Sequence, residues 1–264
     1  MTDTRPLILL TNDDGIHAEG LRYLRAAAES IGQVRVVAPE AEQSAVGHSI
    51  TLYDPIKARE VFRDGVLYGY GISGTPADSV KLALYSLLEK PPALVMSGIN
   101  DGANLGLNVL YSGTVSAATE AAILGLPAMA VSLDQKKDPP FAWAVPHIEA
   151  LAAWVLRHGL PKGVALNVNI PALPPEKIRG YRLTRQGLTK FKESFEQRED
   201  PRGNHYYWLT GQATADDTAE DGDVAAVKQG YVSVTPLFYD LTAHSHRETL
   251  SCSLSTMKTT EIPA

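Results

Sequence analysis

Short apolar runs alternate with longer amphipathic stretches through the first half of the chain. The apolar runs are residues 7–11, 34–38, 93–97 and 128–132. The amphipathic stretches are residues 20–30, 78–88 and 117–124. Because the apolar runs lack polar alternation, they are typical of parallel strands covered on both faces. The order strand, helix, strand, helix predicts an α/β fold with a doubly wound, mostly parallel sheet.

Residues 51–70 depart from this pattern. Two alternating runs meet at Arg63, Asp64 and Gly65, which predicts an antiparallel hairpin on the edge of the sheet. A helix is expected to begin near Pro76 with Thr75 as its cap, because Pro suits the first helical position and Thr the cap.

The second half of the chain becomes irregular after a predicted helix at residues 148–158 and a strand at 164–170. Residues 186–223 are polar and acidic with few apolar periods, and a last strand is expected at 231–235 before a helix or arm after Leu241. Since this stretch has too few apolar residues for a core of its own, we expect residues 1–185 to form the catalytic core. Residues 186–264 are then a C-terminal extension of the same domain, used in exchange between subunits.

Composition excludes several classes of protein. A net charge of −6 over 264 residues argues against binding of polymeric nucleic acid, which needs an excess of basic residues. The apolar run at residues 6–10 is too short for a membrane span or a signal-peptide core. Cys252 is the only cysteine, so no disulfide framework is possible within the chain. We expect a cytoplasmic protein with no membrane partner.

Two adjacent carboxylates, Asp13 and Asp14, follow the first apolar run. In an open parallel sheet, ligands bind beyond the carboxyl ends of the strands, and neighbouring carboxylates there need a cation, a proton or strong hydrogen bonds to offset their repulsion. Ser44 and Asn100 follow other strands and offer further oxygen ligands of the kind that Mg²⁺ or Mn²⁺ prefers. The alternative is an ordinary Asp-Gly turn that leads into a helix.

A glycine- and asparagine-rich loop at residues 97–114 precedes a helical run. Free amides at a helix start, together with the hydroxyls of Ser112 and Thr114, favour phosphate binding, although either residue could simply cap the helix. A cation site beside an anion site suits hydrolysis of a phosphate monoester by a metal-activated water. Direct attack by Asp13 or Asp14 remains open.

Six motifs in collinear order carry a family resemblance. They are NDDGIHAEGL (12–21), EQSAVGHSIT (42–51), GTPADSV (74–80), SGINDGANLG (97–106), YSGTVSAATE (111–120) and YVSVTPL (231–237). The chain resembles the stationary-phase survival protein SurE family over almost its whole length. The resemblance implies a Rossmann-like, three-layer αβα core whose C-terminal segments are exchanged in a homodimer or homotetramer.

The resemblance also implies an activity and its residues. The activity is that of a 5′-nucleotidase, hydrolysis of nucleoside 5′- and 3′-monophosphates with one divalent ion, Mg²⁺ or Mn²⁺, per subunit. Catalysis would rest on Asp13 and Asp14. Carried over by position, the metal ligands are Asp13, Asp14, Ser44 and Asn100, and the phosphate contacts are Asn104, Ser112, Gly113 and Thr114. Alternatives are a broader acid phosphatase, an exopolyphosphatase, an aspartyl-phosphate enzyme or a non-catalytic nucleotide binder.

Several other residues near these motifs have ordinary structural interpretations. We expect His17 to pack against a helix, His48 to make a loop hydrogen bond, and Glu120 to be a surface or supporting carboxylate. The aromatic residues 206–208 are expected to be buried against the sheet.

Overall fold

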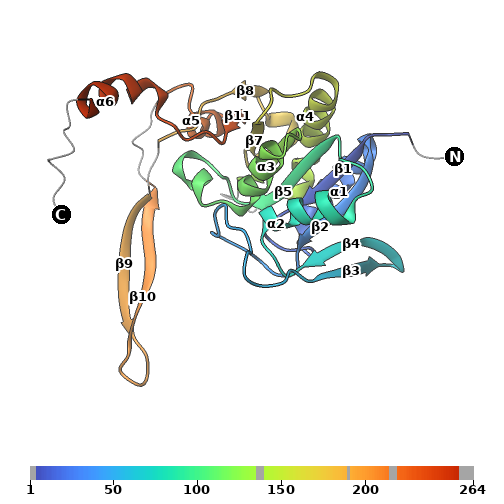
Figure 1. Ribbon diagram of the computed structural model, residues 1–264, viewed down its shortest axis with the longest axis horizontal. Coiled ribbons are helices and arrows are strands. Elements are labelled where there is room, and N and C mark those ends of the chain that lie inside the picture. Colours follow the sequence, from blue (N-terminus) through green and yellow to red (C-terminus); the bar gives the residue numbers. More distant parts are fainter. Residues whose placement is uncertain (1–3, 135–139, 189–190, 214–218, 256–264) are drawn as a thin grey trace.

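The computed structural model (Figure 1) describes residues 4–134, 140–188, 191–213 and 219–255. Within these residues one sheet has the strand order β3-β4-β2-β1-β5-β6-β7-β11-β8. Its strands are β1 (Leu7–Thr11), β2 (Gln33–Pro39), β3 (Ala58–Arg63), β4 (Val66–Ile72), β5 (Leu94–Asp101), β6 (Ala128–Leu133), β7 (Val164–Ile170), β8 (Tyr181–Leu183) and β11 (Val232–Phe238).

Most neighbouring strands of this sheet are parallel. β1 pairs in parallel with β2 and β5, and β5, β6 and β7 continue the parallel run. β3 is antiparallel to β4 at one edge, joined through Asp64 and Gly65, whose φ angles of 50° and 76° suit a tight hairpin turn. The mostly parallel sheet and the edge hairpin are therefore confirmed.

Helices cover both faces of the sheet (Figure 1). α1 (Glu19–Ile31) and α4 (Val145–His158) pack against the face that carries Ile8 and Leu10. α2 (Pro76–Leu82) and α3 (Gly113–Ile123) pack against the opposite face, which carries Leu9. Successive side chains of β1 point to opposite layers, which explains why its residues 7–10 are all apolar. The three-layer αβα core is therefore confirmed.

α2 begins as the sequence predicts. Thr75 accepts a hydrogen bond from the backbone N–H of Asp78, and the Asp78 carboxylate accepts one from the backbone N–H of Thr75. Such a reciprocal cap contributes about 1 kcal/mol. The helix continues as a π-helical turn over Ala83–Leu87.

Two boundaries differ from the sequence expectations. The hairpin starts at Ala58 and not at residue 51, because Thr51 donates its backbone N–H to the Asp78 carboxylate and Pro55 has no N–H for a ladder. β5 extends past residue 97 to Asp101, so Asn100 lies within the end of the strand.

The C-terminal part both joins the sheet and projects from it. β11 pairs with β7 and β8 inside the main sheet, which confirms the last predicted strand. β9 (Phe191–Glu199) and β10 (His205–Ala213) form a separate antiparallel hairpin that extends away from the sheet (Figure 1). The remaining helices are α5 (Asp223–Lys228) and α6 (Arg247–Leu254). Residues 256–264 of the predicted arm lie outside the described residues.

The hairpin carries exposed aromatic residues. Tyr206, Tyr207 and Trp208 are 42%, 58% and 57% exposed, so the expectation that they pack against the sheet is wrong. Among the described residues, β9 and β10 pair only with each other, in a sheet separate from the main one.

Among the described residues, no helix combines the length and the apolar character that a membrane span needs.

Candidate functional site

A cavity of about 450 Å³ lies at the carboxyl ends of β1 and β5. This is the position where open parallel sheets bind ligands. Six of the eight predicted site residues line it: Asp13, Asp14, Ser44, Asn100, Asn104 and Ser112. The sequence interpretation did not single out the other lining residues, Glu42, Ala45, Asp101, Asn108 and Tyr111.

The remaining two predicted residues, Gly113 and Thr114, lie against Asp13 at the start of α3. The hydroxyl of Thr114 is fully buried and donates to Asp13 Oδ1 and, at 3.2 Å, to Asn100 Oδ1. The start of α3 lies so close to Asp13 that a Cβ on Gly113 would be 2.8 Å from the Asp13 Cβ and 2.9 Å from Oδ2. Only glycine fits there, and the backbone amides of Gly113 and Thr114 hydrogen-bond to the Asp13 carboxylate.

Negative charge accumulates in this cavity. Burial raises the pKa of Asp13, although hydrogen bonds from Thr114 oppose the shift. Burial also raises the pKa of Asp14 to about 7, with further contributions from the charges of Asp13, Asp101 and Glu42. Without a cation, these carboxylates repel one another at neutral pH. The electrostatic setting therefore favours a positively charged ligand.

The oxygen donors around the cavity fit a hard divalent cation. Asp13 and Asp14 offer carboxylates, Ser44 a hydroxyl and Asn100 an amide oxygen, since its amide nitrogen donates to Gly102 O at 2.7 Å. Within the described ranges, no group of three or more His, Cys, Asp or Glu side chains is arranged to hold a metal. A site here would combine two carboxylates with neutral oxygens, which suits Mg²⁺ or Mn²⁺ rather than zinc.

Ser112 has the capping role that the sequence left open. Its side chain accepts a hydrogen bond of 3.1 Å from the backbone N–H of Val115 at the start of α3. The residue is also among those that line the cavity. Capping and contact with a ligand are thus compatible at this position.

Asn104 is fixed by buried polar residues of β6 and β7. Its backbone N–H donates to Asn169 Oδ1 at 2.8 Å, its carbonyl accepts from Asn167 Nδ2 at 2.9 Å, and its side-chain amide donates to Ser132 Oγ at 2.9 Å. The three partners are all fully buried. Ser132 closes one of the predicted apolar runs, but the two asparagines of β7 gave no recognisable signal.

The next part of the loop is held by the C-terminal half of the chain. Gly106 donates its backbone N–H to Asp223 Oδ2 at 2.9 Å and accepts from Gln186 Nε2 at 2.9 Å. Asp223 is fully buried. These long-range partners were not predicted, because nothing in the local sequence links residues 106 and 223.

The structural interpretations of His17, His48 and Glu120 have different outcomes. His17 is exposed, so its predicted helix packing is wrong. His48 makes the expected loop hydrogen bond, 2.7 Å from Nε2 to Glu120 Oε2. Glu120 is buried rather than on the surface, and Lys81 Nζ lies 2.5 Å from its other oxygen.

Known proteins are similar to this chain in sequence and in fold. A family model described as Survival protein SurE matches residues 8–193. A 5′-nucleotidase SurE of Syntrophobacter fumaroxidans is 50% identical over 243 residues, covering 92% of this chain and 97% of that protein. One from Moorella thermoacetica is 48% identical over 250 residues, covering 94% and 96%. The crystal structure of the SurE protein from Aquifex aeolicus matches with a TM-score of 0.83 at 42% identity, over 94% of this chain and all of that chain. The chain therefore belongs to the SurE family.

Proposed function

We propose that this chain is a 5′-nucleotidase that hydrolyses nucleoside 5′-monophosphates, and also 3′-monophosphates, to nucleoside and phosphate. The observation that carries the proposal is one cavity in which Asp13 and Asp14 face the start of α3. The relatives from S. fumaroxidans and M. thermoacetica carry the name 5′-nucleotidase. Carboxylates that attract a cation, next to a helix start that attracts an anion, suit a phosphate monoester.

In this proposal Asp13, Asp14, Ser44 and Asn100 hold one divalent ion per subunit, Mg²⁺ or Mn²⁺. When bound, the ion supplies positive charge that offsets the phosphoryl charge and activates water. The hydroxyl of Thr114 orients Asp13 and favours its ionised form against the effect of burial. Asp14 has its pKa raised to about 7 in the chain alone, so the ion would also keep this carboxylate deprotonated.

The phosphate is proposed to lie against the α3 side of the cavity. Asn104 and Ser112 line this side, while Gly113 and Thr114 contribute the first turn of the helix. The backbone amides of Gly113 and Thr114 already bind the Asp13 carboxylate, so the attraction for an anion on this side comes from the positive end of the helix dipole. Because the ion and the phosphate would share one cavity, the phosphorus would face a water beside Asp13 and Asp14.

Water rather than a carboxylate is the proposed nucleophile. Asp13 is 6% exposed and already accepts hydrogen bonds from Thr114, so attack by its carboxylate on phosphorus would have to break these bonds. A phosphate analogue that trapped a covalent adduct on Asp13 or Asp14 would reverse this assignment.

The assembly and the compartment belong to the same proposal. We propose that the chain works as a homodimer or homotetramer in the cytoplasm. The exposed aromatic side chains of the β9–β10 hairpin support exchange of this segment between subunits, because such apolar surface is usually covered. Residues 186–264 would then serve assembly while residues 1–185 carry the chemistry.

The test is phosphate release from AMP and GMP with Mn²⁺ or Mg²⁺, with and without a chelator. We expect metal-dependent release from the wild type and a loss of more than about a hundredfold in Asp13→Asn, since even residues that only support a ligand cost 10- to 100-fold. Glu29→Gln is the matched control, because it alters an exposed pair with Arg25 on α1 outside the cavity lining. Unchanged release in Asp13→Asn, or nucleotide binding without any turnover, would refute the proposal.

A further inference from the structure

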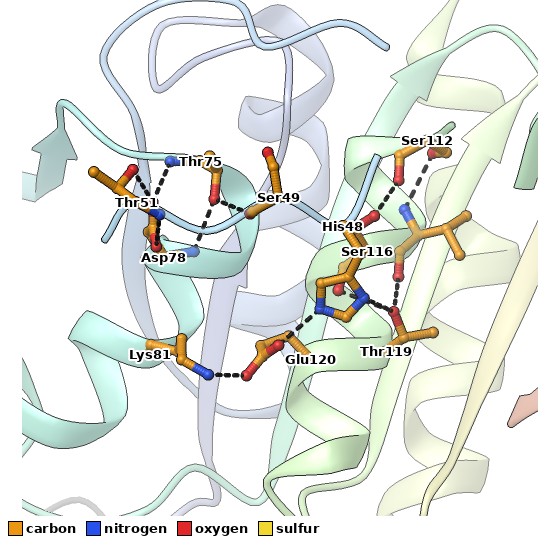
Figure 2. Close-up of polar contacts among 11 residues, drawn as sticks. His48, Ser49, Thr51, Thr75, Asp78, Lys81, Ser112, Ser116, Thr119 and Glu120 are labelled. Carbon is orange, nitrogen blue, oxygen red and sulfur yellow. Dashed lines mark hydrogen bonds and ion pairs between the residues drawn. The ribbon is translucent and has the colours of Figure 1, made fainter. Parts of the chain in front are cut away.

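The β2–β3 loop, residues 40–57, brings Glu42 and Ser44 to the cavity. Four residues after Ser44, His48 points toward Thr119 and Glu120 of α3 (Figure 2). His48 Nε2 lies 2.7 Å from Glu120 Oε2, and its Nδ1 lies 3.4 Å from Thr119 Oγ1. The loop that presents a predicted metal ligand is thus tied by a side chain to the middle of α3.

Glu120 joins this loop to a second helix. Its other oxygen accepts from Lys81 Nζ of α2 at 2.5 Å, and Figure 2 shows the carboxylate between the two bases. The Glu120 side chain is only 5% exposed, whereas Lys81 and His48 are 39% and 34% exposed. Loss of either partner would leave part of the buried Glu120 charge uncompensated, which costs free energy. The arrangement therefore keeps the loop in contact with both helices.

The remainder of the loop has few other restraints near Ser44. Gln43 donates its backbone N–H to Asp13 O at 2.7 Å, and Gly47 donates to Tyr111 O at 3.0 Å. Ser44 and Ala45 are exposed. Ala45 has a φ of 56°, a conformation that costs free energy in residues other than glycine and persists only where the surroundings impose it. The contact of His48 is well placed to impose it.

The loop beyond His48 is fixed to α2 instead. Thr75 Oγ1 donates to Ser49 O at 2.8 Å, and Thr51 Oγ1 donates to Asp78 Oδ2 at 2.7 Å (Figure 2). These bonds anchor the far end of the loop on the opposite side of His48 from Ser44. Release of His48 would therefore leave the Ser44 segment held only by the backbone bonds of Gln43 and Gly47, while the far end of the loop stayed attached to α2.

We propose that His48 and Glu120, with Lys81 as counter-charge, are positioning residues that hold Ser44 at the cavity. Helix α3 then supports both sides of the site, Asp13 through Thr114 and Ser44 through the Glu120–His48 contact. The consequence for catalysis rests on the proposed function. The anchoring of the β2–β3 loop by His48 and Glu120 does not depend on it.

The experiment measures amide hydrogen exchange and Mn²⁺ binding in His48→Ala. We expect the amides of Gln43 and Gly47 to exchange about tenfold faster or more, because the local opening becomes easier. The dissociation constant for Mn²⁺, followed by the electron paramagnetic resonance signal of free Mn²⁺, should rise about tenfold. The amides of β1 and α3 should be unaffected.

A conservative variant separates positioning from general destabilisation. His48→Gln keeps a donor toward Glu120 and should restore most of the Mn²⁺ affinity and the slow exchange. Glu120→Gln, which keeps the shape but removes the charge, should fall between wild type and His48→Ala. Glu29→Gln, at the exposed pair with Arg25, should leave both readouts at the wild-type value.

Three results would overturn the inference. They are unchanged exchange at Gln43 and Gly47, unchanged Mn²⁺ affinity despite faster exchange, and absence of rescue in His48→Gln. Failure of the proposed function would look different: the wild type would hydrolyse no nucleotide, while the exchange and Mn²⁺ measurements would still follow the expected order.

Discussion

The two loops that meet at the cavity are anchored in different ways. The β5–α3 loop, residues 102–112, is fixed through Asn104 and Gly106 by fully buried side chains of β7 and by Asp223. The β2–β3 loop, residues 40–57, leaves Ser44 exposed and depends near it on two backbone hydrogen bonds and on His48. The first loop is anchored in the core through Asn104 and Gly106, whereas the second is held near Ser44 by contacts at the surface.

This difference separates two physical tasks. Buried polar networks are rigid because a missing partner leaves an unsatisfied group in a low-dielectric interior, which suits a wall that must hold phosphate oxygens in fixed positions. An exposed loop that is held by a few contacts can move at little cost, so the wall that carries Ser44 is the more mobile of the two. A change that weakens the anchoring of the β5–α3 loop should therefore act mainly on stability. A change near Ser44 in the β2–β3 loop should act mainly on activity.

The largest effect on stability is expected on the buried side. Asn169→Ala removes the acceptor for the Asn104 backbone N–H and a donor to the Asn104 carbonyl. Because the site is fully buried, the free energy of unfolding should fall by about 2–3 kcal/mol. Urea denaturation measures the change.

The matched control for that variant is Asn108→Ala. Asn108 also lines the cavity but is exposed, so the free energy of unfolding should stay within about 0.5 kcal/mol of the wild type. Equal losses in the two variants would contradict the distinction between the loops.

An intermediate effect is expected from pH in metal-free protein. The pKa of Asp14 is about 7 in the folded chain against 3.8 for an ordinary aspartate. Between these values the folded state holds a proton that the unfolded state has released, so stability should fall as pH rises from about 4 to 7. Thermal melting in chelator across this range tests the sign.

Asp14→Asn removes that titration and is the control for the pH series. The pH dependence of its melting temperature should flatten in chelator. A wild type whose stability rises over the same range, with Asp14→Asn following it, would contradict the electrostatic account of the cavity.

The smallest effect on stability is expected at Ser44. Ser44→Ala removes an exposed hydroxyl that contacts Glu42, so the free energy of unfolding should change by less than about 0.5 kcal/mol. Nucleotide hydrolysis should nevertheless fall about tenfold or more, since Ser44 is one of the proposed metal ligands. Parallel loss of stability and activity would place Ser44 in the core rather than at the site.

Much of this molecule could be predicted from its sequence because the decisive signals are local. Apolar runs without alternation specify buried parallel strands, and Thr75 followed by Pro76 and Asp78 specifies a helix start. Asp13 and Asp14 directly after an apolar run mark a strand end at which ligands bind. These patterns were sufficient for the sheet, its edge hairpin and five of the residues that line the cavity, whereas Asn104 came from the family resemblance.

The supporting residues could not be predicted because their partners are distant in sequence. Glu120 contacts His48 and Lys81 across 72 and 39 positions, and Asp223 contacts Gly106 across 117. The burial of Glu120 would ordinarily raise its pKa, but hydrogen bonds from His48 and Lys81 outweigh burial and leave the pKa below its usual value. No pattern within one helix announces such a partnership. Glu42 and Asp101 were also missed, although both adjoin recognised motifs.

Direct titration of the chain with Mn²⁺, run beside AMP hydrolysis, tests the central claim that Asp13 and Asp14 hold a cation needed for the reaction. We predict one ion bound per chain, hydrolysis that rises in proportion to occupancy, and loss of both in Asp13→Asn. Stoichiometric binding that persists in Asp13→Asn, or hydrolysis by wild-type protein with no ion bound, would contradict the account.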